Sequence, residues 1–243
     1  MKTKALFILL GLLFLLPMTV LSQNLAVVSE DVSVMSNEMA YASYLASPAS
    51  GGPYPGIILI HSFNGLQPGY RTMTDQLASE GFVVLAVGWQ TFERSPSDET
   101  MLFLMEDSVA FLAGRSNVDA GRIGLTGFCA GGRYTMLFMP QIRQFGAGVA
   151  WYGFPYAGDN PPVALVNELT EPMLIIHGTA DRPSPIGEIY DYAEALDTAG
   201  SPFEMKIYQG QPHGFMLDDD DMNMNDVATD AFNEMVDFFR RKL

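Results

Sequence analysis

Short runs rich in apolar residues recur along the chain, and they constrain its fold more than any other feature. Continuous apolar runs of this length are typical of strands that are buried on both faces of a sheet. Segments with helical periodicity separate them, and this alternation predicts an α/β fold: a mostly parallel central sheet with helices on both faces. The strand-like runs are 40–45, 57–61, 82–87, 122–126, 147–151, 173–177 and 203–208. The helical segments are 70–79, 98–112, 185–199 and one marked by Val227, Ala231, Met235 and Phe238.

Composition limits the domain count and the classes of partner. The 243 residues are 48% hydrophobic and 17% charged, which suits one globular domain with a large core. The formal net charge of -15 argues against nucleic acid and anionic membrane surfaces as partners. A single cysteine excludes an internal disulfide, so the core alone must stabilise the fold, and we expect a monomer.

The first 22 residues have the pattern of a secretory signal peptide. Lys2 and Lys4 precede an apolar stretch over 5–21, and Ser22 supplies a small residue for cleavage. The alternative is an uncleaved membrane anchor, but the run is short for a span and Pro17 interrupts it. We therefore expect an exported protein, periplasmic or secreted, with one domain over 23–243 and no stable membrane insertion after cleavage.

The only cysteine lies between glycines, in Gly127-Phe128-Cys129-Ala130-Gly131, directly after a strand-like run. This spacing is typical of a nucleophile elbow, which is a strained turn between a strand and a helix. The residues on either side of the nucleophile must be small. The turn would aim the backbone N–H of Ala130 at a developing oxyanion, and the positive end of the following helix would favour thiolate. A buried, inert cysteine is the alternative interpretation.

A cysteine nucleophile needs a base and a group that orients the base. Of the three histidines, His61 and His177 end buried strands and are candidates for shaping loops, whereas His213 follows the last strand. Asp181 follows the preceding strand after a tight turn. The order Cys129, Asp181, His213 is that of α/β-hydrolases. Taken alone, Asp181 could be a turn former and His213 an ordinary loop residue.

With these residues identified, the chain resembles the dienelactone hydrolase family of α/β-hydrolases. The resemblance spans most of the mature chain, and 122–132 is its specific part; the other matching segments are 55–61, 77–86 and 213–215. It implies the α/β-hydrolase fold, Cys129 as nucleophile, His213 as base and Asp181 as orienter. It also implies an oxyanion hole formed by the backbone N–H groups of Ala130 and Phe63.

Two departures from the family's pattern bear on the substrate. Ser62 stands where the family carries a Glu that holds the resting thiol protonated, so we expect His213 to deprotonate Cys129 directly. No Arg follows His213 to hold a substrate carboxylate; four aspartates, 218–221, come instead. Arg94 could supply positive charge, although a solvated surface arginine is the alternative, as for Arg71. Ser62 and Arg94 are therefore candidate substrate contacts.

The sequence thus predicts a hydrolase of neutral esters or lactones that works through a thioacyl intermediate, with no metal and no organic cofactor. The acidic run could suggest calcium, but it lacks the EF-hand's Gly and Glu, and a solvated loop near a helix N-terminus is expected. A non-catalytic binding protein on the same fold remains an alternative. A thiol peroxidase is another, although the chain has no resolving cysteine.

Overall fold

A computed structural model describes residues 24–243, so the predicted signal peptide at 1–22 lies outside the described residues. Its centre is an eight-stranded sheet in the order β1-β2-β4-β3-β5-β6-β7-β8. Strands β3 to β8 run parallel, and only β1 and β2 are antiparallel to their neighbours. The strands are β1 (Val27–Ser36), β2 (Met39–Pro48), β3 (Tyr54–Ile60), β4 (Val83–Val87), β5 (Val118–Phe128), β6 (Phe145–Trp151), β7 (Met173–Gly178) and β8 (Phe203–Tyr208).

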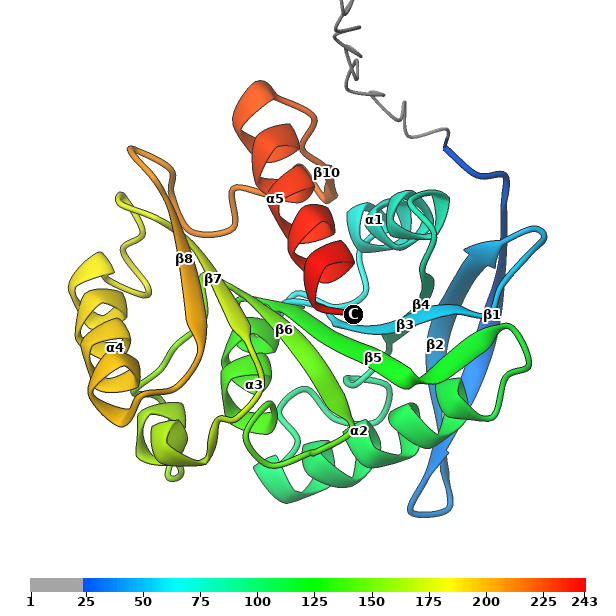
Figure 1. Cartoon of the computed structure of the whole chain (residues 1–243), viewed down its shortest axis with the longest axis horizontal. Coiled ribbons are helices and arrows are strands. Elements are labelled where there is room, and N and C mark those ends of the chain that lie inside the picture. The colour runs from blue at the N-terminus through cyan, green and yellow to red at the C-terminus, as the bar shows by residue number, and fades with distance from the viewer. Residues whose placement is uncertain (1–23) are drawn as a thin grey trace, which may run out of the picture.

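Five α-helices cover the two faces of this sheet (Figure 1). Helices α1 and α5 pack on one face, and α2, α3 and α4 pack on the other. Their bounds are α1 (Pro68–Ser79), α2 (Asp98–Ala113), α3 (Ala130–Phe138), α4 (Ile186–Ala199) and α5 (Asp226–Lys242), and a 3-10 helix, η1, spans Pro162–Glu168. No helix of the described part has both the length and the apolarity needed to cross a bilayer.

The predicted strands and helices all form, with ends that local chemistry sets. Helix α2 begins after Ser97, whose side chain accepts a hydrogen bond from the Thr100 N–H at 3.1 Å. Asn225 caps α5 in the same way, accepting from the Ala228 N–H at 2.8 Å. The basic residues Arg240, Arg241 and Lys242 occupy the last turn of α5, where they complement the helix dipole.

Two elements are larger or more ordered than the sequence predicts. Strands β1 and β2 form a hairpin of ten residues on each side, whereas only 40–45 reads as a strand in the sequence. Most of β1 is exposed, so its residues show no apolar pattern. Residues 217–222 form a second hairpin, β9 (Leu217–Asp218) with β10 (Asp221–Met222), in place of the predicted solvated loop.

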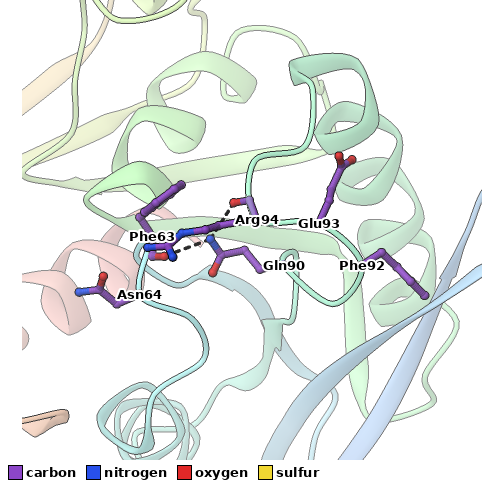
Figure 2. A pocket seen from close by; sticks show the side chains of 6 residues that line it. All are labelled: Phe63, Asn64, Gln90, Phe92, Glu93 and Arg94. Carbon is purple, nitrogen blue, oxygen red and sulfur yellow. Dashed lines mark hydrogen bonds between the residues drawn. The ribbon is translucent and has the colours of Figure 1, made fainter.

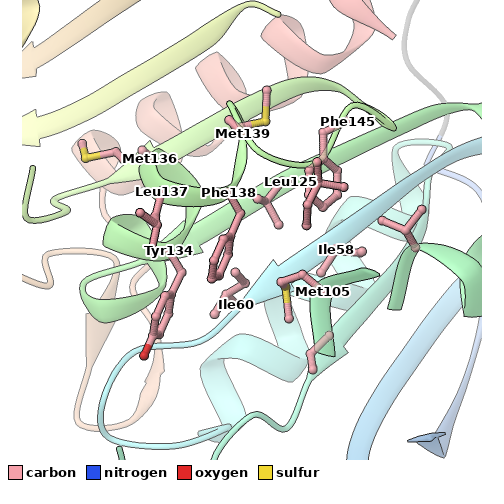
Figure 3. Packing of buried hydrophobic residues seen from close by; sticks show 14 of the residues in the cluster. Ile58, Ile60, Met105, Leu125, Tyr134, Met136, Leu137, Phe138, Met139 and Phe145 are labelled. Carbon is pink, nitrogen blue, oxygen red and sulfur yellow. The ribbon is translucent and has the colours of Figure 1, made fainter. Parts of the chain in front are cut away.

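The core on the α2–α3–α4 face fixes the helix that follows Cys129. Side chains of α3 lie against β3 and β5, as Figure 3 shows for Phe138 with Ile60 and Leu125. Tyr134 and Phe138 stack with their ring centroids 5.6 Å apart. Burial of this large aromatic surface anchors α3, and with it the turn at its start.

Candidate active site

The turn at Cys129 has the strained backbone of a nucleophile elbow. Strand β5 ends at Phe128 and α3 begins at Ala130, which leaves Cys129 alone between them with φ 58° and ψ -113°. A Cβ on Gly127 would lie 2.2 Å from the Gly131 carbonyl oxygen, and one on Gly131 would lie 2.1 Å from that of Ile60. Both glycines are therefore required by close backbone approach.

His213 and Asp181, which follow β8 and β7, form a partly buried hydrogen-bonded pair. The Nδ1 of His213 lies 2.8 Å from Asp181 Oδ2, and the other carboxylate oxygen accepts from the Ser184 N–H at 2.8 Å. The Asp181 side chain is fully buried. Because Nδ1 faces Asp181, Nε2 is the ring atom left for the thiol of Cys129, with which the imidazole interacts.

The surroundings of His213 favour its protonated form. Burial alone would lower the pKa of His213, but its hydrogen bonds with Asp181 and Cys129 raise that pKa to about 9. The rings of Tyr152 and Phe154 flank the imidazole, with centroids 5.1 Å and 5.5 Å away. The ring is thus held in a fixed orientation and charged over the neutral pH range.

The two predicted oxyanion donors lie on neighbouring strand ends. Ile60 pairs with Gly127 in the parallel register of β3 and β5, and Phe63 and Ala130 each follow their paired residue by three positions. Among the hydrogen bonds of residues 24–243, none engages the backbone N–H of Phe63 or of Ala130. Both donors therefore remain available for an anionic oxygen.

A cavity of about 390 Å³ opens at Cys129 and His213. Cys129 and His213 line it, and so does Ser62, one of the two predicted substrate contacts. Burial raises the pKa of Tyr70, another lining residue, so its phenol is a neutral donor. The lining residues are Ser62, Asn64, Gln67, Tyr70, Cys129, Tyr152, His213, Gly214, Leu217, Asp219 and Asp220.

Comparisons with known proteins identify the family to which the chain belongs. The model of the Dienelactone hydrolase family matches residues 41–94 and 89–243, nearly all of the part that the structure describes. The chain belongs to the dienelactone hydrolase family. It is therefore a hydrolase, and the predicted α/β-hydrolase fold is confirmed.

The relatives of this protein have low sequence identity to it, but their alignments cover most of its length. A protein from Methylorubrum extorquens, named as a carboxymethylenebutenolidase, is 28% identical over 247 residues, covering 92% of this chain and 84% of the relative. A protein from a Bradyrhizobium species, named as a 2-oxo-3-(5-oxofuran-2-ylidene)propanoate lactonase, is 26% identical and covers 86% and 92%. A crystal structure from Klebsiella pneumoniae, described as a dienelactone hydrolase, superposes with a TM-score of 0.81 at 25% identity and covers 89% and 99%.

Arg94, the other predicted substrate contact, lies outside the cavity that Cys129 lines. Its guanidinium sits over the Phe63 ring, with Cζ 4.7 Å from the ring centroid. It lines a separate pocket of about 370 Å³ with Phe63, Asn64, Gln90, Phe92 and Glu93 (Figure 2). Arg71 is paired with Asp31 at 2.7 Å on the surface. Among the described residues that line the Cys129 cavity, none is basic except His213.

The acidic run is exposed, as predicted, but it forms a hairpin rather than an irregular loop and lines the cavity. Asp219 and Asp220 make the two-residue turn of the β9–β10 hairpin, with φ 46° and 74°. The Asp220 carbonyl accepts from the Gly69 N–H at 2.8 Å, and its carboxylate accepts from the Gln67 side chain. The hairpin therefore rests on the start of α1 and brings two carboxylates to the cavity.

Sequence reasoning missed the residues that α1 and the turn before it contribute, Tyr70 and Gln67. Tyr70 follows the helical period of core residues, so nothing in the sequence separates it from the core. Of the aromatic residues near the site, Tyr152 lines the cavity, whereas Trp89 is buried and Phe92 packs on Tyr41 at 5.1 Å between ring centroids. Phe63 itself lines the neighbouring pocket.

Proposed function

We propose that this chain hydrolyses neutral carboxylic esters or lactones through a Cys129–His213–Asp181 triad and a covalent thioacyl intermediate. One observation carries the proposal. His213, whose Nδ1 lies 2.8 Å from the buried Asp181 carboxylate, lines the same cavity as the strained Cys129. This arrangement supports Cys129 as nucleophile, His213 as base and Asp181 as orienter.

In the first half of the reaction, His213 Nε2 holds the proton that comes from the Cys129 thiol, and the sulfur attacks the substrate carbonyl carbon. A C–S bond forms, and the carbonyl electron pair moves to oxygen, which the Ala130 and Phe63 N–H groups would bind. Each such donor lowers the barrier by about 3 kcal/mol. The oxyanion then collapses, the C–O bond to the leaving group breaks, and that alkoxide takes the proton from His213.

In the second half, His213 removes a proton from water, and the resulting hydroxide attacks the thioester. Collapse of the second oxyanion breaks the C–S bond and releases the acid. The sulfur leaves as thiolate, beside an imidazolium whose charge Asp181 stabilises. The raised pKa of His213, about 9, supports an imidazolium at this stage.

The walls of the cavity support a neutral substrate. Asp219 and Asp220 place negative charge at the cavity, and its lining, within the described chain, includes no Arg or Lys. A substrate carboxylate would meet repulsion from these aspartates. The printed names of the relatives, a carboxymethylenebutenolidase and a lactonase, support a lactone ring as one form of the ester.

The test is hydrolysis of p-nitrophenyl acetate and of a neutral five-membered lactone by the protein over 23–243, beside Cys129→Ala. We expect activity in the wild type and its loss in the variant. Equal rates in both proteins would remove Cys129 as nucleophile. If the folded wild type hydrolyses neither substrate, a binding protein on this fold would be favoured.

We also propose that residues 1–22 act as a signal peptide and that the mature protein is exported. The pattern of Lys2, Lys4 and the apolar stretch over 5–21 supports this proposal. Terminal sequencing of protein recovered from outside the cytoplasm should give Gln23 as the first residue. Recovery of the full chain from membranes would contradict cleavage.

A further inference from the structure

The loop that carries the Phe63 N–H has three consecutive carbonyls, each held by a side chain. The Trp89 Nε1–H donates to the His61 carbonyl at 3.1 Å, and the His61 Nδ1–H donates to the Ser62 carbonyl at 2.7 Å. The Gln90 amide donates to the Phe63 carbonyl at 3.0 Å. Such a series of side-chain donors is not required by the strand register, because β3 ends at Ile60.

Gln90 is the member of this series that reaches furthest from the core. Figure 2 shows its amide between Phe63 and Arg94, with dashed lines to both. The Nε2 atom donates one hydrogen to the Phe63 carbonyl and the other to the Arg94 carbonyl at 2.8 Å. Since both partners are carbonyl oxygens, the amide must present nitrogen to them, and an ionised acid at this position could not donate to either.

The Arg94 side chain reinforces the same contact from the other direction. Its guanidinium covers the Phe63 ring, so both the backbone and the side chain of Phe63 are attached to residues 90–94. Gln90 and Arg94 lie outside the Cys129 cavity. Their contact with the backbone and the ring of Phe63 is therefore a route by which they act on the reacting atoms.

We infer that Gln90 is a positioning residue that fixes the Phe63 backbone so that its N–H points at the developing oxyanion. This inference rests on the proposed function, since it needs Phe63 as an oxyanion donor. Without the two hydrogen bonds of the Gln90 amide, the loop after Ser62 gains freedom, and the N–H donor is no longer oriented before the reaction. A donor misplaced by about 1 Å costs catalysis up to about 10²-fold.

The experiment compares two reactions of the same sulfur. Acylation of Cys129 by p-nitrophenyl acetate forms an oxyanion, whereas alkylation by iodoacetamide does not. Gln90→Glu keeps the shape of the side chain and removes both hydrogen bonds. Gln141→Glu is the matched control, because the Gln141 amide also donates to a backbone carbonyl, that of Leu137 at 2.7 Å, in the helical turn after α3. Gln90→Ala serves as a second variant, and thermal midpoints are measured for all.

We expect Gln90→Glu to lower the acylation rate by about 10- to 100-fold, mainly in kcat, while the alkylation rate stays within about 2-fold of the wild type. The control Gln141→Glu should leave both rates unchanged. Equal losses in acylation and alkylation, in both Gln90 variants, would mean a general disturbance of the site and would overturn the inference.

An unchanged acylation rate in Gln90→Glu and Gln90→Ala would also overturn it. These outcomes are distinct from failure of the proposed function. That failure would appear in the wild type, as no acylation or as acylation that survives Cys129→Ala. The Gln90 comparison is informative wherever the wild type is acylated at Cys129.

Discussion

The nucleophile elbow over 127–132 and the acidic hairpin over 217–222 line the same cavity, yet they are held in place by different means. At the elbow, backbone segments pack directly against each other, because a Cβ on Gly131 would lie 2.1 Å from the Ile60 carbonyl oxygen. The hairpin is attached to α1 at a few points, such as the Gly69 N–H bond to the Asp220 carbonyl, and its turn is exposed.

We expect from this difference that the elbow determines the rate of the reaction and that the hairpin determines substrate selectivity. The elbow has no room to change, so it fixes the position of the sulfur relative to the proposed oxyanion donors. The hairpin is a surface turn whose side chains can vary without disturbing the sheet, so it can set which substrates enter. We expect changes near the elbow and the triad to alter rate or folding, and changes in the hairpin to alter preference.

The largest effect should come from Asp181→Asn. Loss of the carboxylate removes the charge that raises the His213 pKa to about 9, so that pKa should fall and the imidazolium should deprotonate at lower pH. With an alkyl ester, whose leaving group needs the His213 proton, kcat should drop on the order of 10²- to 10⁴-fold.

The pH dependence of kcat/KM shows the direction in which the substitution shifts the His213 pKa. In the wild type, kcat/KM should decline as pH rises through about 9, because His213 then loses its proton. In Asp181→Asn the decline should begin at lower pH. Profiles measured from pH 5 to 10 with matching declines in both proteins would contradict the role given to Asp181.

The next effect tests the crowding at the elbow. Gly131→Ala should lower the free energy of unfolding by about 3 kcal/mol, because the new Cβ must displace the Ile60 carbonyl. Gly187→Ala in α4 is the control, since a Cβ there meets nothing within 4 Å. That control should be neutral or stabilise by up to about 1 kcal/mol. Urea unfolding of both variants would decide, and a stable Gly131→Ala would refute the packing argument.

The smallest effect concerns the hairpin. Asp219→Asn should raise kcat/KM for an anionic aryl hemisuccinate, relative to the acetate, by about 2- to 5-fold at low salt. Asn tolerates the positive φ of 46° at this position, so the turn should persist. Asp218→Asn makes the same charge change outside the cavity lining. An equal shift in both variants would show that only net charge matters.

The same contrast explains what the sequence could predict. The strands from β3 to β8 and the order Cys129, Asp181, His213 follow from apolar runs and glycine spacing, which are local signals. The β9–β10 hairpin does not, because 218–221 is a uniform acidic run and its register depends on Gly69, where a Cβ would lie 2.5 Å from Leu217. The hydrogen bond from Gln90 to Phe63 is equally invisible, since it joins residues 27 positions apart.

The most direct test of the central claim is to trap the acyl group on Cys129. Wild-type protein mixed with p-nitrophenyl acetate and quenched in acid within milliseconds should gain the mass of one acetyl group, located by peptide mapping at Cys129. His213→Ala should retain any such adduct longer, because it lacks the base that activates water. Hydrolysis that proceeds without an adduct on Cys129, or with the acetyl group on another residue, would contradict the account.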